Sequence, residues 1–164
     1  MEFPAIFEQF GASLQGVRLK ENLARNEPLM YIPNKCIIST LHARDSQIGY
    51  LFDMHDNLFV TTTERDTNIL MVYMIYERLK GEESFYHPYF EMIDAFQHSN
   101  YWPEEIIERS DFNMFKLGIK DSKEKYEQEW EKAKNFFTIY PDFFDAERCN
   151  KDLYLWALNI LCSR

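Results

Sequence analysis

The sequence predicts an α+β fold in which short β-strands in residues 1–60 precede a mainly helical region over residues 61–164. Two observations predict it. Before residue 60, short apolar pieces are separated by polar residues, whereas after it apolar residues recur at helical spacing. A length of 164 residues fits one domain rather than two complete ones.

Three short segments near the start are predicted to be strands. In Gly16–Leu19, apolar and basic side chains alternate with a period near two. Leu29–Pro33 and Cys36–Ser39 are brief apolar runs, and the intervening Asn34-Lys35 is typical of a turn. Short strands joined by tight turns are favoured here over alternating strand and helix units.

The first predicted helix, residues 68–79, has no polar face. Apolar side chains occupy almost every position, which predicts a buried helix at the centre of the molecule. Thr61, Thr62 and Thr63 offer hydroxyl groups for capping its start. Gly81 stands where the residue after a helix often adopts a left-handed conformation.

Two further helices are predicted in the middle of the chain. Pro103, followed by two glutamates, is typical of the first position of a short helix. Asp121-Ser122 can cap a long helix over residues 123–140, whose apolar side chains are spaced by three and four residues. Pro141 is expected to end it.

The last predicted helix, residues 152–164, carries an apolar stripe. Burying each large side chain of that stripe is worth about 1.5–3 kcal/mol. We therefore expect this helix to dock on something, and to contact another chain or a missing C-terminal half.

Composition excludes several classes of function. Asp and Glu total 27 against 18 Lys and Arg, a net charge of −9, so nucleic-acid binding is not expected. The longest apolar run, Ile69–Tyr76, has eight residues, and no signal or transit pattern opens the chain, so no membrane insertion and a cytoplasmic location are expected.

Motifs for catalysis or metal binding are also scarce. Five glycines leave little room for a phosphate-binding loop, and three cysteines without C-x-x-C spacing predict reduced, buried thiols. Cys162 is expected to be a small core residue, although its neighbour Arg164 would favour a thiolate. The run Asp53-Met54-His55-Asp56 could be drawn as a metal loop, but such loops are common and no metal is expected.

Five stretches of the chain together resemble a known family. They are Phe10–Ser13; Gly16–Arg18 with Glu27–Pro33; Tyr76–Gly81 with Ser84–Tyr89; Trp102–Glu105; and Tyr154–Ala157 with Ser163-Arg164. Their order is similar to that of the SET-domain methyltransferases of the Rubisco large-subunit lysine and actin-histidine type, from about residue 7 to the end. The resemblance implies SET strands followed by a helical insertion.

The resemblance also implies an activity. Members of the family transfer a methyl group from S-adenosylmethionine to a Lys or His side chain of a protein substrate, by in-line displacement. By position, Ser13, Gln15 and Gly16 would lie along the cofactor, mostly through main-chain groups. Arg164 would lie near the substrate channel, although an arginine at a helix C-terminus is equally compatible with a solvated side chain.

The sequence departs from the family in two places. The first glycine of the family's Gly-x-Gly turn is Leu14 here, which weakens the case for close backbone approach to the cofactor. The family's Asn-His pair and channel tyrosine follow the Ser-Arg motif, and no Asn-His pair occurs in these residues. We therefore expect a chain truncated before the C-terminal SET half, with no catalytic residue of its own and no activity alone.

Two other interpretations remain open. The chain could be a non-catalytic structural or interaction subunit, built on a degenerate SET scaffold within a larger assembly. It could also be an unrelated helical domain with a chance likeness to the family.

Overall fold

A computed structural model describes residues 19–55, 65–93 and 101–163. The chain divides into two compact units, Met1–Pro33 and Asn34–Arg164. In the first unit, the described residues 19–33 form irregular backbone around a turn at Asn26, where φ is +70°. The boundary expected near residue 60 falls in 56–64, outside the described residues.

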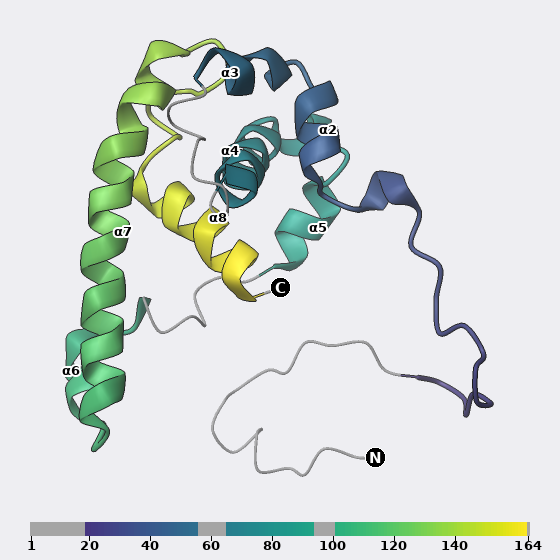
Figure 1. The fold of residues 1–164 in the computed structure, drawn as a ribbon, viewed down its shortest axis with the longest axis horizontal. Coiled ribbons are helices and arrows are strands. Elements are labelled where there is room, and N and C mark those ends of the chain that lie inside the picture. The colour runs from purple at the N-terminus through teal and green to yellow at the C-terminus, as the bar shows by residue number, and fades with distance from the viewer. Residues whose placement is uncertain (1–18, 56–64, 94–100, 164) are drawn as a thin grey trace. The chain divides into compact units, whose positions relative to one another are not determined.

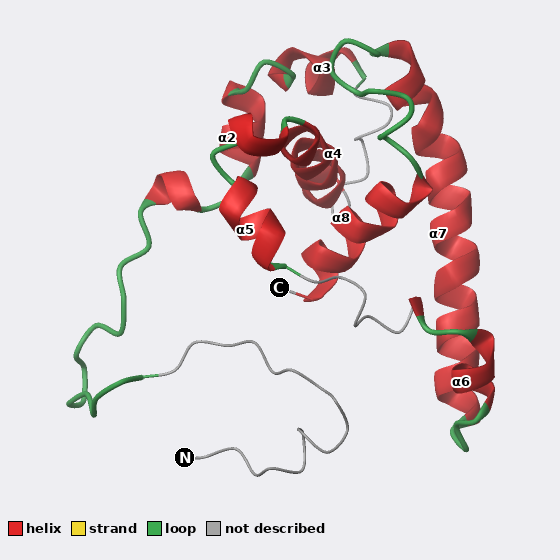
Figure 2. Cartoon of the chain, turned by 180° about the vertical axis from the view of Figure 1, so that it is seen from behind, coloured by secondary structure: helices red, strands yellow, loops and turns green. Residues whose placement is uncertain are grey.

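The described residues are helical or irregular and contain no β-strand (Figure 2), so the predicted α+β fold is wrong for this part of the chain. Leu29–Pro33 is irregular, and part of the predicted Cys36–Ser39 strand belongs to a 3-10 helix, η1 (Asn34–Cys36). Most of Gly16–Leu19 lies outside the described residues. The backbone groups of a strand form hydrogen bonds with a neighbouring strand. Here the Ile37 N–H instead donates to the Asn34 carbonyl of the same segment, with 2.9 Å between nitrogen and oxygen.

Helix α4 (Arg65–Leu79) lies at the centre of the second unit (Figure 1). Its residues from Met71 to Glu77 are all buried, which confirms the prediction of a central helix without a polar face. Helices α2 (Thr40–Asp45), α5 (His87–Met92) and α8 (Lys151–Ser163) pack against it, and α3 (Gly49–Met54) adds Leu51 and Phe52 to the core.

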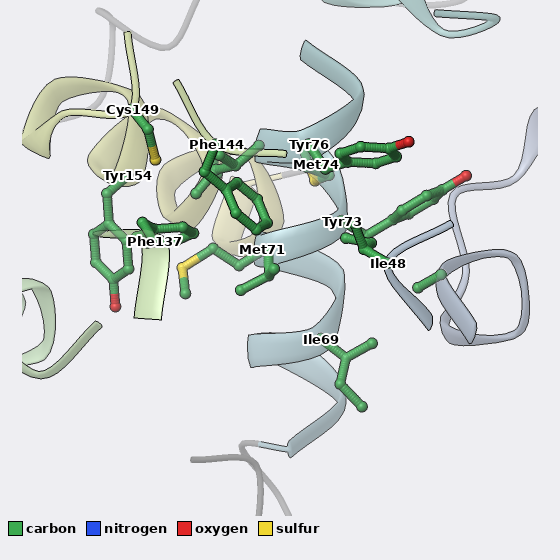
Figure 3. Packing of buried hydrophobic residues seen from close by; sticks show 14 of the residues in the cluster. Ile48, Ile69, Met71, Tyr73, Met74, Tyr76, Phe137, Phe144, Cys149 and Tyr154 are labelled. Atoms are coloured by element: carbon green, nitrogen blue, oxygen red, sulfur yellow. The ribbon is translucent and has the colours of Figure 1, made fainter. Parts of the chain in front are cut away.

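Helix α8 docks within the chain. Trp156, Ala157 and Ile160 of its apolar stripe are buried in the core, and α4 is its main neighbour. Figure 3 shows Phe137, Phe144, Cys149 and Tyr154 beside α4, on the side opposite Ile48. Helix α8 thus docks on α4 of the same chain, and its contact with another chain or a missing C-terminal half stays a prediction.

The long helix α7 (Asn113–Ile139) begins ten residues before its predicted start. Asp121 and Ser122 do not cap it but continue it, because their side chains reach solvent and no residue there interrupts the backbone hydrogen bonds. Its end just before Pro141 agrees with the prediction. Pro103 stands one position outside α6 (Glu104–Glu108), as its cap, rather than at its first position.

None of the helices in the described ranges combines the length and the apolar content that crossing a bilayer requires.

Candidate functional site

All four residues that the resemblance placed at a site lie outside the described part of the chain. Ser13, Gln15 and Gly16 fall in residues 1–18, and Arg164 is the last residue. A candidate site therefore has to be built from the second unit.

Helix α4 ends in a buried polar network. The Glu77 side chain is buried, with the residue only 4% exposed, and accepts a hydrogen bond from the Ser84 hydroxyl at 2.6 Å. Its other oxygen accepts from the Lys80 ammonium at 2.8 Å. Ser84 reaches Glu77 because Gly81, at φ +61°, reverses the chain into the 3-10 helix η3 (Gly81–Glu83). The left-handed glycine after the helix is as predicted.

The next residue, Arg78, joins three helices. Its guanidinium carbon lies 4.1 Å from the centroid of the Trp156 ring on α8. It also donates to the Phe90 carbonyl on α5 at 3.4 Å. Burial lowers the pKa of Arg78, and Glu91 and Tyr101 oppose that shift. Residues from separate stretches of the resemblance thus meet in one contact.

An open cleft of about 990 Å³ lies beside the C-terminal half of α4. Its walls come from the loop and helix before α3, from α4, from the segment around η3, and from the loop between α7 and α8. The lining residues are Lys35, His42, Asp45, Ser46, Gln47, Tyr73, Tyr76, Glu77, Leu79, Lys80, Glu83, Phe85, Tyr86, Pro141, Asp142, Phe143, Asp145 and Arg148. We call it the α4 cleft.

Three tyrosines form the inner wall of the α4 cleft. Tyr73 and Tyr76 leave α4 with their hydroxyl groups directed away from Phe144 (Figure 3). The Tyr76 hydroxyl donates to Gln47 Oε1 at 3.1 Å, and the Tyr86 hydroxyl donates to the Lys35 carbonyl at 3.3 Å. The rings of Tyr73 and Tyr86 meet edge-on at 6.3 Å. Hydrogen bonds therefore fix this wall to the loop after α2, through Gln47, and to η1, through Lys35.

These tyrosines are weak acids in this setting. Burial raises the pKa of the Tyr73 hydroxyl, and the Glu77 carboxylate and Tyr86 raise it further. Burial also raises the pKa of Tyr76 and of Tyr86. The three phenols stay protonated at neutral pH, so they can donate hydrogen bonds and offer ring faces but do not act as bases.

The histidine and cysteines that the sequence analysis considered as chemical groups do not form a site in the described residues. The His55 ring meets the rings of Tyr140 and Phe136 edge-on, and its Nε2 is hydrogen-bonded to the Tyr140 hydroxyl. Within the described ranges, no three His, Cys, Asp or Glu side chains gather as a metal site. Cys149 is buried as predicted, but Cys36 and Cys162 are exposed, so the burial expected for these two thiols is wrong.

Comparison of the chain with models of known protein families, with curated proteins and with solved structures found no match.

The sequence analysis did not find the α4 cleft. Its walls come from four segments, and helical spacing shows only that Tyr73 and Tyr76 share a side of α4. The signal available was the presence of two tyrosines within the apolar run Ile69–Tyr76.

Proposed function

We propose that this chain is part of an S-adenosylmethionine-dependent protein N-methyltransferase of the SET type, acting on a Lys or His side chain. In this proposal, residues 34–164 supply a helical region that holds protein substrate, and methyl transfer needs groups that these residues do not contain. The strands first expected in residues 29–39 are not part of it.

One observation carries the proposal. Arg78 belongs to the stretch Tyr76–Gly81 and Trp156 to the stretch Tyr154–Ala157, and both stretches resemble the family. The Arg78 guanidinium carbon lies 4.1 Å from the centroid of the Trp156 ring, so two segments that resemble the family in sequence are neighbours in space. The buried hydrogen bond between Glu77 and Ser84 also joins the stretch Tyr76–Gly81 to the stretch Ser84–Tyr89.

The test uses the protein that carries this chain, purified from its source. It is incubated with S-adenosylmethionine bearing a tritiated methyl group and with a mixture of proteins, and the products are hydrolysed to amino acids. Labelled methyllysine or methylhistidine, abolished by excess S-adenosylhomocysteine, is the expected result. Absence of label from a folded protein that binds S-adenosylmethionine would overturn the proposal.

A second measurement addresses the 164 residues alone. Calorimetry with S-adenosylmethionine is expected to show no binding, because no Asn-His pair is available to hold the cofactor. Tight binding would contradict that part of the proposal and leave the rest standing.

The alternative function is a non-catalytic interaction subunit. It is favoured by apolar side chains that are exposed where α6 meets the start of α7: Ile106 is 50% exposed, Phe112 77% and Met114 83%. In that case the purified protein brings a partner with it in fixed proportion and transfers no methyl group. Replacing Phe112 and Met114 by serine would release the partner without unfolding the chain.

A further inference from the structure

The walls of the α4 cleft carry more carboxylates than cations. Five carboxylates line it, against three Lys and Arg side chains. Glu77 is neutralised by Lys80 through their ion pair at 2.8 Å. Asp45, Glu83 and Asp142 form no ion pair with any residue in the described ranges. The charge left in the cleft is therefore negative, and a ligand that enters it gains by being cationic.

The aromatic rings of the cleft attract ammonium groups. The Lys80 ammonium lies 5.2 Å from the centroid of the Tyr76 ring, and the Lys35 ammonium lies 5.8 Å from that of Phe85. Both distances are within the range of cation–π attraction. The chain's own lysines thus show that a side chain of this chemistry fits against the walls of the cleft.

Tyr76 contacts two segments that each carry one of the unpaired carboxylates of the cleft. Its hydroxyl holds Gln47, two residues beyond Asp45, and its ring meets that of Phe143 edge-on at 6.1 Å, one residue beyond Asp142. Asp45 ends α2, whereas Asp142 follows α7, so the two carboxylates line the cleft from different segments.

We propose that the α4 cleft binds a basic segment of a partner protein, whose Lys or Arg side chains are attracted by the unpaired carboxylates of Asp45 and Asp142 in the cleft wall. A volume of about 990 Å³, open to solvent, accommodates several residues of an extended peptide. The net charge of −9 favours the approach of a basic partner. The proposal depends on the cleft and not on methyl transfer, so it holds for either function proposed above.

The test is fluorescence anisotropy with the full chain and a labelled octapeptide that alternates lysine with glycine. The same peptide with glutamate in place of lysine is the reference. We expect saturable binding of the lysine peptide alone, weakened by added salt. The double variant Asp45→Asn, Asp142→Asn is expected to weaken binding about fivefold or more, because two charge contacts are lost.

A matched variant separates the cleft from the general charge of the protein. Asp111→Asn with Glu124→Gln removes the same charge from exposed positions outside the cleft, and less than about a twofold change is expected. All four positions are exposed, so both double variants are expected to fold, which circular dichroism checks. Equal weakening by the two pairs, or no preference for the lysine peptide, would overturn the proposal. The binding experiment contains no S-adenosylmethionine, so its result is independent of the methyl-transfer assay.

Discussion

The guanidinium group of Arg78 is stacked on the indole ring of Trp156, with 4.1 Å between its central carbon and the ring centroid. The Phe90 ring meets the same indole edge-on at 5.4 Å, and the Phe90 carbonyl accepts a hydrogen bond from Arg78. Since these residues lie on α4, α8 and α5, one cluster joins three helices. Helix α8 has 13 residues and is too short to be stable in isolation, so its order depends on such contacts.

Replacing Trp156 by alanine is expected to lower the free energy of unfolding by about 3–5 kcal/mol, because the side chain is buried and its removal leaves a cavity. Trp102→Ala is the control: that ring is 37% exposed, and a loss of about 1 kcal/mol or less is expected. Urea denaturation followed by circular dichroism measures both. Equal losses of unfolding free energy in the two variants would show that the cluster around Arg78 does not stabilise the fold more than the exposed Trp102 ring does.

Ser84→Ala is expected to cost roughly 1.5–3 kcal/mol, because it removes a hydrogen-bond donor from the buried Glu77 carboxylate. Ser84→Thr keeps the hydroxyl and should restore most of that stability. Ser122→Ala, on α7 and away from this network, should change stability by about 0.5 kcal/mol or less. Thermal unfolding of the three variants decides; a neutral Ser84→Ala would mean that Lys80 alone satisfies Glu77.

The helices that could be predicted from sequence are those whose own pattern determines their burial. Helix α4 has no polar face, and such a helix is stable only when other elements surround it. Pro141 ends α7 by local chemistry alone. Each of these predictions needed only neighbours within a few residues.

The strands predicted at Leu29–Pro33 and Cys36–Ser39 are wrong because a brief apolar run of four or five residues also fits irregular and helical backbone. Ser39, the last residue of the predicted strand Cys36–Ser39, is instead the N-cap of α2, and its side chain accepts a hydrogen bond from the His42 N–H at 3.3 Å. A serine before Thr40–Asp45 was the missed signal. The α4 cleft could not be predicted at all, because contacts such as that of Tyr76 with Gln47 join segments far apart in the chain.

Two glycines are expected to respond to alanine with opposite signs. Gly81 has φ +61°, so Gly81→Ala should cost about 1 kcal/mol through backbone strain, although no atom lies within 4 Å of the added carbon. Gly118 lies inside α7 with open space beside it, so Gly118→Ala should gain about 0.5–1 kcal/mol. Chemical denaturation measures both, and a stabilising Gly81→Ala would exclude the left-handed conformation.

Alkaline pH is expected to destabilise the fold through groups that are buried in their neutral forms. Burial raises the pKa of the Cys149 thiol from 9.0 to about 12, with Asp145 adding to the shift, and burial also raises the pKa of Tyr154. A group whose pKa is higher in the folded state contributes stability that is complete below its unfolded pKa and lost as pH rises toward the folded one. For Cys149 this window runs from about pH 9 to about pH 12.

The free energy of unfolding should therefore fall above pH 9, with a slope of up to about 1.4 kcal/mol per pH unit from one thiol. Urea titrations at half-unit intervals from pH 8 to 10.5 measure it. Cys149→Ala should flatten the slope, because the buried thiol is gone, whereas Cys162→Ala removes an exposed thiol and should leave the slope unchanged. Stability that is constant across this window, or a slope unaffected by Cys149→Ala, would show that the thiol ionises as readily in the folded chain as in the unfolded one.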